Sequence, residues 1–146
     1  MTTQFFAYPV TLSHEEDTVL VSFPDVPEAL TEGDDEAEAL TEATDCLVAA
    51  LGGYIELRRD IPAPSRPRRG QPVVTVPPLV AAKLALYRAM RGSGLTRVAL
   101  GKRLGISEGA VRRLLDLDHR SHIGQVEAAL AVLGKRLVVE VRDTAA

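Results

Sequence analysis

The chain has 146 residues, of which 46% are hydrophobic and 25% are charged, and its formal net charge at pH 7 is −3. This length suits one ordinary domain or two small ones, and it excludes a large enzyme core joined to a regulatory module. There is no apolar run of about 18 residues and no signal-peptide pattern at the N-terminus, so we expect a cytoplasmic protein. The single cysteine, Cys46, excludes an internal disulfide and a cysteine-rich zinc site.

The charge is divided unevenly between the two halves of the chain. Residues 1–60 contain 14 acidic and two basic side chains, a balance of −12, whereas residues 61–146 contain six acidic and 15 basic ones, a balance of +9. An asymmetry of this size indicates two modules whose partners have opposite charge. We therefore expect the acidic half to suit a basic protein and the basic half to suit nucleic acid.

The N-terminal half begins with a pattern of short strands. Two alternating or β-branched runs, Phe6–Leu12 and Thr18–Phe23, flank a short polar segment, which predicts a β-hairpin. Pro24 and Pro27 then interrupt strand hydrogen bonding, because proline has no backbone N–H to donate. Glu28–Thr31 is expected to form a third strand.

A helix is expected after these strands. Asp34 or Asp35 can cap it, and Glu36 and Glu38 in its first turn favour the positive end of the helix dipole. Apolar residues recur at helical spacing from Ala37 to Leu51. Strands followed by a helix predict an α+β module with an antiparallel sheet.

The middle of the chain reads as a connector and a domain boundary. Residues 61–70 are rich in proline and arginine, which favours an extended segment, and Val73–Val76 is expected to be the final strand of the sheet. Pro77 and Pro78 end that strand and can open a helix. We therefore divide the chain into an N-terminal domain, residues 1–76, and a C-terminal all-α domain, residues 77–146.

Residues 95–115 carry the most informative pattern of the C-terminal half. Thr96 can cap a short helix, Gly105 supplies a left-handed turn residue, and Ser107 can cap a second helix that ends at about Leu115. Two short helices around a glycine turn are typical of a helix-turn-helix. Gly101 is expected where the helices approach most closely. The apolar residues expected between them are Leu100, Leu104, Ile106, Val111 and Leu114.

This pattern resembles the helix-turn-helix of the Cro/repressor-like family, in which the second helix enters the major groove of DNA. The resemblance implies base contacts near the start of that helix and phosphate contacts from the basic residues around it. Gly109 departs from this expectation, because it offers no side chain for base recognition. The predicted DNA-binding residues are Thr96, Arg97, Lys102, Arg103, Ser107, Glu108, Gly109, Arg112, Arg113 and Arg120.

The C-terminal tail, Arg136–Arg142, alternates apolar and charged residues like a strand. Because helix-turn-helix proteins usually bind two DNA half-sites as dimers, this strand could pair across a two-fold axis or pack on its own domain. We expect at least a homodimer that involves the C-terminal domain.

The N-terminal half resembles the HicB antitoxin family. The segments that carry the resemblance are Tyr8-Pro9, the Phe-Pro-Asp-Val-Pro-Glu motif of residues 23–28, Thr31–Asp34 with the alanine-rich helix beyond, and Ile61–Ser65. Glu28 departs from the family motif, in which glycine is more usual, and this puts the local turn geometry in question.

The resemblance implies a partial RNase H-like module that binds and neutralises a HicA toxin, a small basic ribonuclease, and a DNA-binding end that represses the operon encoding both proteins. Electrostatic attraction would speed the encounter with the toxin, and buried apolar contacts would supply the lasting affinity. The predicted toxin-binding residues are Asp34, Asp35, Glu36, Glu38, Glu42 and Asp45.

Two other classes of function remain as alternatives. The first is a stand-alone repressor whose N-terminal domain senses a small molecule, although aromatic residues make up only 4% of the chain. The second is an enzyme, which is disfavoured because the predicted strands carry almost none of the carboxylates that metal-dependent nuclease chemistry needs. His119 and His122 lack a third ligand nearby in the sequence. We therefore expect no catalytic residue, metal ion or cofactor.

Overall fold

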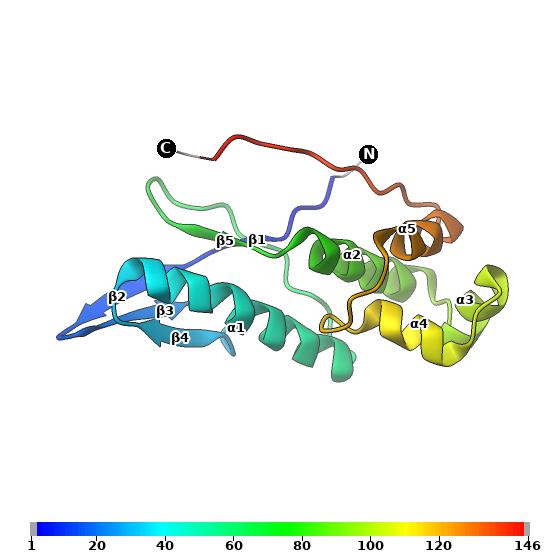
Figure 1. The fold of residues 1–146 in the computed structure, drawn as a ribbon, viewed down its shortest axis with the longest axis horizontal. Helices are drawn as coiled ribbons and strands as arrows, with labels where there is room; N and C mark the ends of the chain where they lie inside the picture. The colour runs from blue at the N-terminus through cyan, green and yellow to red at the C-terminus, as the bar shows by residue number, and fades with distance from the viewer. Residues whose placement is uncertain (1–2, 145–146) are drawn as a thin grey trace.

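Two small antiparallel sheets and one long helix form the N-terminal part of the chain, and a group of shorter helices forms the other end (Figure 1). The computed structural model describes residues 3–144. The strands and helices confirm the predicted α+β class. None of the helices in the described residues is long and apolar enough to cross a membrane.

The predicted hairpin is present, but its first strand is displaced, because residues 7–9 belong to the other sheet and the hairpin strand starts at Thr11. Strands β2 (Thr11–Glu15), β3 (Thr18–Ser22) and β4 (Leu30–Gly33) form an antiparallel sheet in that order. The polar turn is shorter than expected, because Glu15 already pairs with Thr18. The third strand starts two residues later than expected.

The last strand of the N-terminal part joins a different sheet from the one we expected. Strand β5 (Val73–Thr75) pairs antiparallel with β1 (Ala7–Pro9) and does not extend the three-stranded sheet. The Gln71 side-chain amide donates to the Val10 carbonyl oxygen at 3.2 Å, which holds the connector against the start of the hairpin. The pairing of β5 with β1 joins segments more than 60 residues apart in the sequence.

Helix α1 (Glu36–Glu56) packs along β4 and β3 (Figure 1). Asp35 is its N-cap, since its Oδ1 accepts a hydrogen bond from Glu38 N–H at 2.8 Å. Its buried face agrees with the predicted one from Ala43 to Leu51, whereas Ala37, at the start of the predicted stripe, is exposed. A Cβ atom on Gly33 would lie 2.4 Å from the Ala39 nitrogen, so the first turn packs directly against β4. The buried residues of α1 are Ala39, Ala43, Leu47, Leu51, Tyr54 and Ile55.

Glu28, the departure from the family motif, does not distort its turn. Its φ angle is negative, as it is for every described residue other than glycine and Arg58. Its carboxylate accepts hydrogen bonds from Tyr54 Oη at 2.6 Å and from Arg59 Nη1 at 3.1 Å. The Tyr54 hydroxyl, a backbone hydrogen bond and the Arg59 guanidinium hold the pKa of Glu28 below its usual value. The glutamate thus ties the turn to the end of α1.

The C-terminal part consists of α2 (Pro78–Ser93), α3 (Arg97–Leu104), α4 (Glu108–Leu115) and α5 (Ile123–Val132). Helix α2 packs against α4 and α5. The buried apolar residues form one cluster that extends from the first strand to α5. The predicted boundary coincides with the start of α2, and the division into two folding units stays a prediction.

Three side chains of α2 hold the segment that leaves α1. Tyr87 Oη donates to the Arg59 carbonyl oxygen at 2.8 Å, and Arg91 Nη1 donates to the Arg58 carbonyl oxygen at 2.8 Å. Arg88 Nη2 donates to the Ile61 carbonyl oxygen at 3.2 Å. The exit of α1 is therefore fixed to α2 by side-chain donors.

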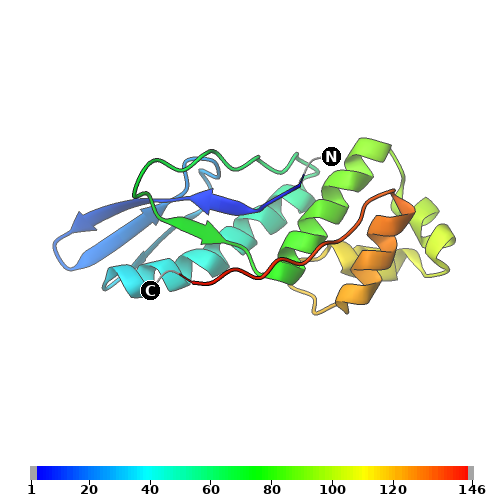
Figure 2. The same cartoon turned by 90° about the horizontal axis from the view of Figure 1, so that it is seen from above.

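The predicted C-terminal strand does not form. Residues 135–144 run back from α5 towards the N-terminal part as an extended segment without a strand partner in the described residues (Figure 2). Val139 and Val141 are 75% and 91% exposed. A strand exists only when its backbone N–H and C=O groups pair with a neighbour, and none of the other residues between 3 and 144 pairs with this segment.

Candidate functional site

The two helices and the turn predicted for residues 96–115 are present at the expected positions. Thr96 Oγ1 accepts from Ala99 N–H at 3.1 Å, and Ser107 Oγ accepts from Ala110 N–H at 3.0 Å, so each residue caps the helix that it precedes. Gly105 has a φ angle of 70°. Local caps and a left-handed glycine therefore produce the α3–turn–α4 unit.

Close packing fixes the angle between α3 and α4. A Cβ atom on Gly101 would lie 2.7 Å from the Ile106 carbonyl oxygen, nearer than any real carbon could approach. Leu100 and Val111 are completely buried between the helices, as predicted, whereas Ile106 is exposed and does not fill the interface. Only a glycine at position 101 allows this approach.

The C-terminal end of α4 is held by a lysine that the sequence analysis did not identify. Lys83 of α2 is completely buried, and its Nζ donates to the carbonyl oxygens of Arg113 at 3.0 Å, Asp116 at 2.6 Å and His119 at 2.7 Å. Burial lowers the pKa of Lys83, while the carboxylates of Asp116 and Asp118 act in the opposite direction. A positive charge at this end of α4 complements the helix dipole.

Lys83 therefore positions α4 relative to α2. An ammonium group has three N–H bonds, and here each one meets a carbonyl oxygen. The sequence places Lys83 within an apolar helical stretch, but this does not predict its burial, because the ammonium group of such a lysine usually reaches solvent. Only the tertiary packing shows that Lys83 is buried.

The predicted DNA-binding residues lie on α3, on α4 and in the loop after α4. Thr96 and Ser107 use their hydroxyl oxygens as caps, while Arg113 and Arg120 are exposed. Lys102 and Arg103 are also exposed, on the last turn of α3. Their assignment to DNA stays a prediction.

Arg112 and Glu108 form an ion pair on α4, with Nη2 and Oε2 2.6 Å apart. The two residues are one helical turn apart and lie on the same face of α4. Gly109 between them has open space around a hypothetical Cβ, with no atom closer than 3.9 Å. Neither packing nor backbone conformation therefore requires a glycine at position 109.

Arg97 and Arg112 meet in a groove of about 270 Å³ between α1 and the α3–turn–α4 unit. We call it the α1–α4 groove. The end of α1 forms its other wall, with Gly52, Glu56 and Arg58 among the lining residues. A side chain from the N-terminal module, Arg58, thus lies beside two of the predicted DNA-binding arginines.

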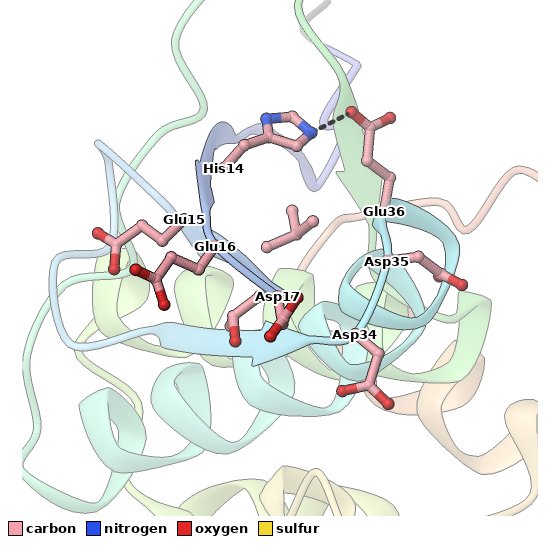
Figure 3. Close-up of a pocket in the computed structure, with 9 residues that line it drawn as sticks. His14, Glu15, Glu16, Asp17, Asp34, Asp35 and Glu36 are labelled. Atoms are coloured by element: carbon pink, nitrogen blue, oxygen red, sulfur yellow. Dashed lines mark hydrogen bonds and ion pairs between the residues drawn. The ribbon is translucent and has the colours of Figure 1, made fainter.

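A second surface, which we call the acidic end, lies where the hairpin turn meets the start of α1 (Figure 3). It is an open depression of about 560 Å³. His14 Nε2 lies 2.8 Å from Glu36 Oε1 and connects the hairpin to the helix (Figure 3). The carboxylates of the acidic end are Glu15, Glu16, Asp17, Asp34, Asp35 and Glu36.

The acidic end contains half of the predicted toxin-binding residues and three further carboxylates that the prediction did not include. Asp34, Asp35 and Glu36 lie in it, whereas Glu38, Glu42 and Asp45 are exposed farther along α1. Asp35 and Glu38 also stabilise the start of α1. The Asp35 carboxylate accepts from Glu38 N–H, and Glu38 Oε2 accepts from Asp34 N–H at 3.1 Å. Glu15, Glu16 and Asp17 join the cluster through strand pairing, which brings the hairpin turn beside the start of α1.

In the described part of the chain, residues 3–144, no three histidine, cysteine or carboxylate side chains come together to hold a metal ion. His119 Nδ1 instead lies 3.0 Å from Ser121 Oγ, next to the carbonyl groups that bind Lys83. The two features that remain as candidate binding sites are therefore the α3–turn–α4 unit with its groove and the acidic end.

Comparison with known proteins identifies the class of this chain. A family model described as the HicB-like antitoxin of bacterial toxin–antitoxin systems matches residues 7–85. Antitoxin HicB 2 of Photorhabdus laumondii is 42% identical over 130 residues, which cover 89% of this chain and 92% of that protein. Antitoxin HicB of Escherichia coli K12 is 40% identical over 89% of this chain and 95% of its own length. Antitoxin HicB of Pseudomonas fluorescens is 36% identical, over 93% and 94% respectively.

These similarities place the chain among the antitoxins of bacterial toxin–antitoxin systems. It belongs to the HicB-like antitoxin family, as its sequence motifs suggested.

The close approach at Gly101 gives a direct test of the α3–turn–α4 geometry. We expect Gly101→Ala to lower the free energy of unfolding by about 1–3 kcal/mol, because the new methyl group meets a backbone oxygen that has little room to move. Gly92→Ala in α2 is the matched control, since nothing lies near its Cβ position, and it should be neutral or stabilising by up to about 1 kcal/mol. Urea unfolding measures both, and equal effects would contradict the packing described here.

Proposed function

We propose that this antitoxin neutralises a HicA-type toxin through its acidic end and represses its own operon in the bacterial cytoplasm through the α3–turn–α4 unit. The role is binding and not catalysis. The observation that carries the proposal is that the two surfaces lie at opposite ends of the molecule, with the length of α1 between them (Figure 1). A helix of 21 residues is about 30 Å long, so a protein and a DNA duplex could be bound at the same time.

The charge of the acidic end supports a basic protein as its partner. Six carboxylates lie around one depression, and His14 is the only side chain there that can become positively charged. Such a field accelerates the encounter with a cationic surface and disfavours nucleic acid. Leu30, at the start of β4, is 62% exposed and can add lasting apolar contact.

The geometry of α3 and α4 supports DNA as the second partner. The first turn of α4 carries Glu108 and Gly109, and Arg112 and Arg113 follow on exposed positions. Arginine can bind guanine through two hydrogen bonds, and glutamate can accept one from cytosine. Lys83 supports this role by holding the far end of α4, because base recognition requires a fixed helix orientation.

The acidic end can be tested with the protein encoded next to this gene. We expect the two proteins to co-purify, and the double variant Glu16→Lys and Asp17→Lys to slow their association about tenfold at low salt, with a smaller difference at high salt. Both residues are exposed on the hairpin turn and make no cap or ion pair in the described structure. The control, Asp118→Lys with Glu127→Lys, makes the same charge change among the C-terminal helices, away from the acidic end. Equal association rates for the two double variants, measured by stopped-flow fluorescence, would contradict the assignment.

Recognition of operator DNA can be tested at Arg112. We expect Arg112→Ala to weaken binding to a duplex from the promoter region by about 1–3 kcal/mol, because a base contact is lost. Arg66→Ala removes the same charge from the exposed connector and serves as the control. A fluorescence anisotropy titration in which both variants bind like the wild type would show that α4 is not the recognition helix.

The tail supports association with a second copy of the chain. Residues 136–144 form no backbone hydrogen bond with the other described residues, so their N–H and C=O groups are available to a partner strand. We expect a chain shortened after Gly134 to sediment as a monomer at concentrations at which the full chain is a dimer. A shortened chain that remains dimeric in analytical ultracentrifugation would exclude the tail from this role.

A further inference from the structure

Arg58 ends α1 with an unusual backbone conformation. Its φ angle is 56°, and it is the one described residue other than glycine with a positive φ. Arg59 N–H donates to the Tyr54 carbonyl oxygen at 2.8 Å, and Arg58 N–H donates to that of Ile55 at 3.1 Å, as at a helix end that reverses direction. Glycine is the usual residue at such a position, because a side chain is disfavoured there.

The surroundings hold this conformation in place. Arg91 Nη1 of α2 donates to the Arg58 carbonyl oxygen at 2.8 Å, and its Nε donates to Asp60 Oδ1 at 2.7 Å. Arg91 thus holds both the Arg58 carbonyl group and Asp60, two residues later, and the backbone conformation between them sets the direction in which the Arg58 side chain leaves the chain. Strained residues held in this way are found disproportionately at functional positions.

The guanidinium groups of the two neighbouring arginines have different roles. Arg59 pairs with Glu28 at 3.1 Å and lies over the ring of Tyr54, with its Cζ 4.2 Å from the ring centre. Arg58 is exposed, and its guanidinium makes no hydrogen bond or ion pair within residues 3–144. Arg59 therefore serves the fold of the N-terminal module, and the structure gives Arg58 no comparable role.

The position of Arg58 connects it to the predicted DNA-binding residues. It lines the α1–α4 groove together with Arg97, at the start of α3, and Arg112, on α4. Glu56 and Asp116 are the acidic residues that line the groove. Arg112 pairs with Glu108, so Arg58 and Arg97 are the arginines of the groove that make no ion pair within residues 3–144.

We propose that Arg58 contacts a backbone phosphate of the operator, so that the N-terminal module contributes directly to the DNA-binding surface. This inference rests on the proposed function of the α3–turn–α4 unit. The start of the first helix of such a unit lies against the DNA backbone when the second helix is in the major groove. Arg58 lies beside that start, and a guanidinium there adds an electrostatic contact without base preference. The acidic end then lies at the first turn of α1, and the DNA contact lies two residues after its last residue.

The variant Arg58→Gly separates a DNA contact from a structural role. Glycine tolerates the positive φ angle better than arginine, so we expect the melting temperature to stay the same or rise. Affinity for the promoter duplex should nevertheless fall about three- to tenfold near 100 mM salt. The slope of log K against log salt concentration should decrease in magnitude by about 0.9, the value for one lost phosphate contact.

Arg69→Gly is the matched control, because it removes the same side chain from the exposed turn before β5, at the opposite end of the molecule from α3 and α4 (Figures 1 and 2). It should bind the duplex like the wild type, with the same salt slope. If Arg58→Gly behaves like this control while Arg112→Ala loses affinity, the inference is wrong and the proposed function stands. If the wild type does not bind the duplex, the proposed DNA-binding function is wrong and this inference falls with it. A loss of affinity with an unchanged salt slope would also overturn the phosphate contact.

Discussion

The structure depends on the side chains of α2 that donate hydrogen bonds to backbone carbonyl oxygens at the C-terminal ends of α1 and α4. Tyr87, Arg88 and Arg91 donate to three carbonyl groups after α1, and Lys83 donates to three more around the end of α4. Buried carbonyl groups are costly when they have no donor, so these contacts fix both exits at once. Helix α2 therefore fixes both the orientation of α4, through Lys83, and the position of the Arg58 backbone, through Arg91.

This arrangement explains how one small chain can present two different surfaces. The acidic end is built from a hairpin turn and the first turn of α1, and the α1–α4 groove is built from the last turn of α1, α3 and α4. Opposite charges stay apart because a rigid helix separates them. Screening at physiological salt acts over about 8 Å, so the acidic end has little electrostatic effect on the arginines at the other end of α1.

Local rules predicted the helices well and the strand pairing less well. Asp35, Thr96 and Ser107 cap their helices as expected, and Gly105 makes the expected left-handed turn, because capping depends on neighbours a few residues away. The partner of β5 and the assignment of residues 7–9 to the hairpin were predicted wrongly. Each depends on residues far apart in the sequence, which local periodicity does not encode.

The sequence by itself determined the family, the α+β class, the helix boundaries near Thr96 and Ser107 and the division of charge between the halves. These properties follow from residue types and short spacings. Tertiary structure alone decided that Lys83 is buried beneath α4, that Glu15–Asp17 join Asp34–Glu36, and that Arg58 lies beside Arg97 and Arg112. Each of these contacts joins segments at least 15 residues apart, so only the packing of the whole chain could bring them together.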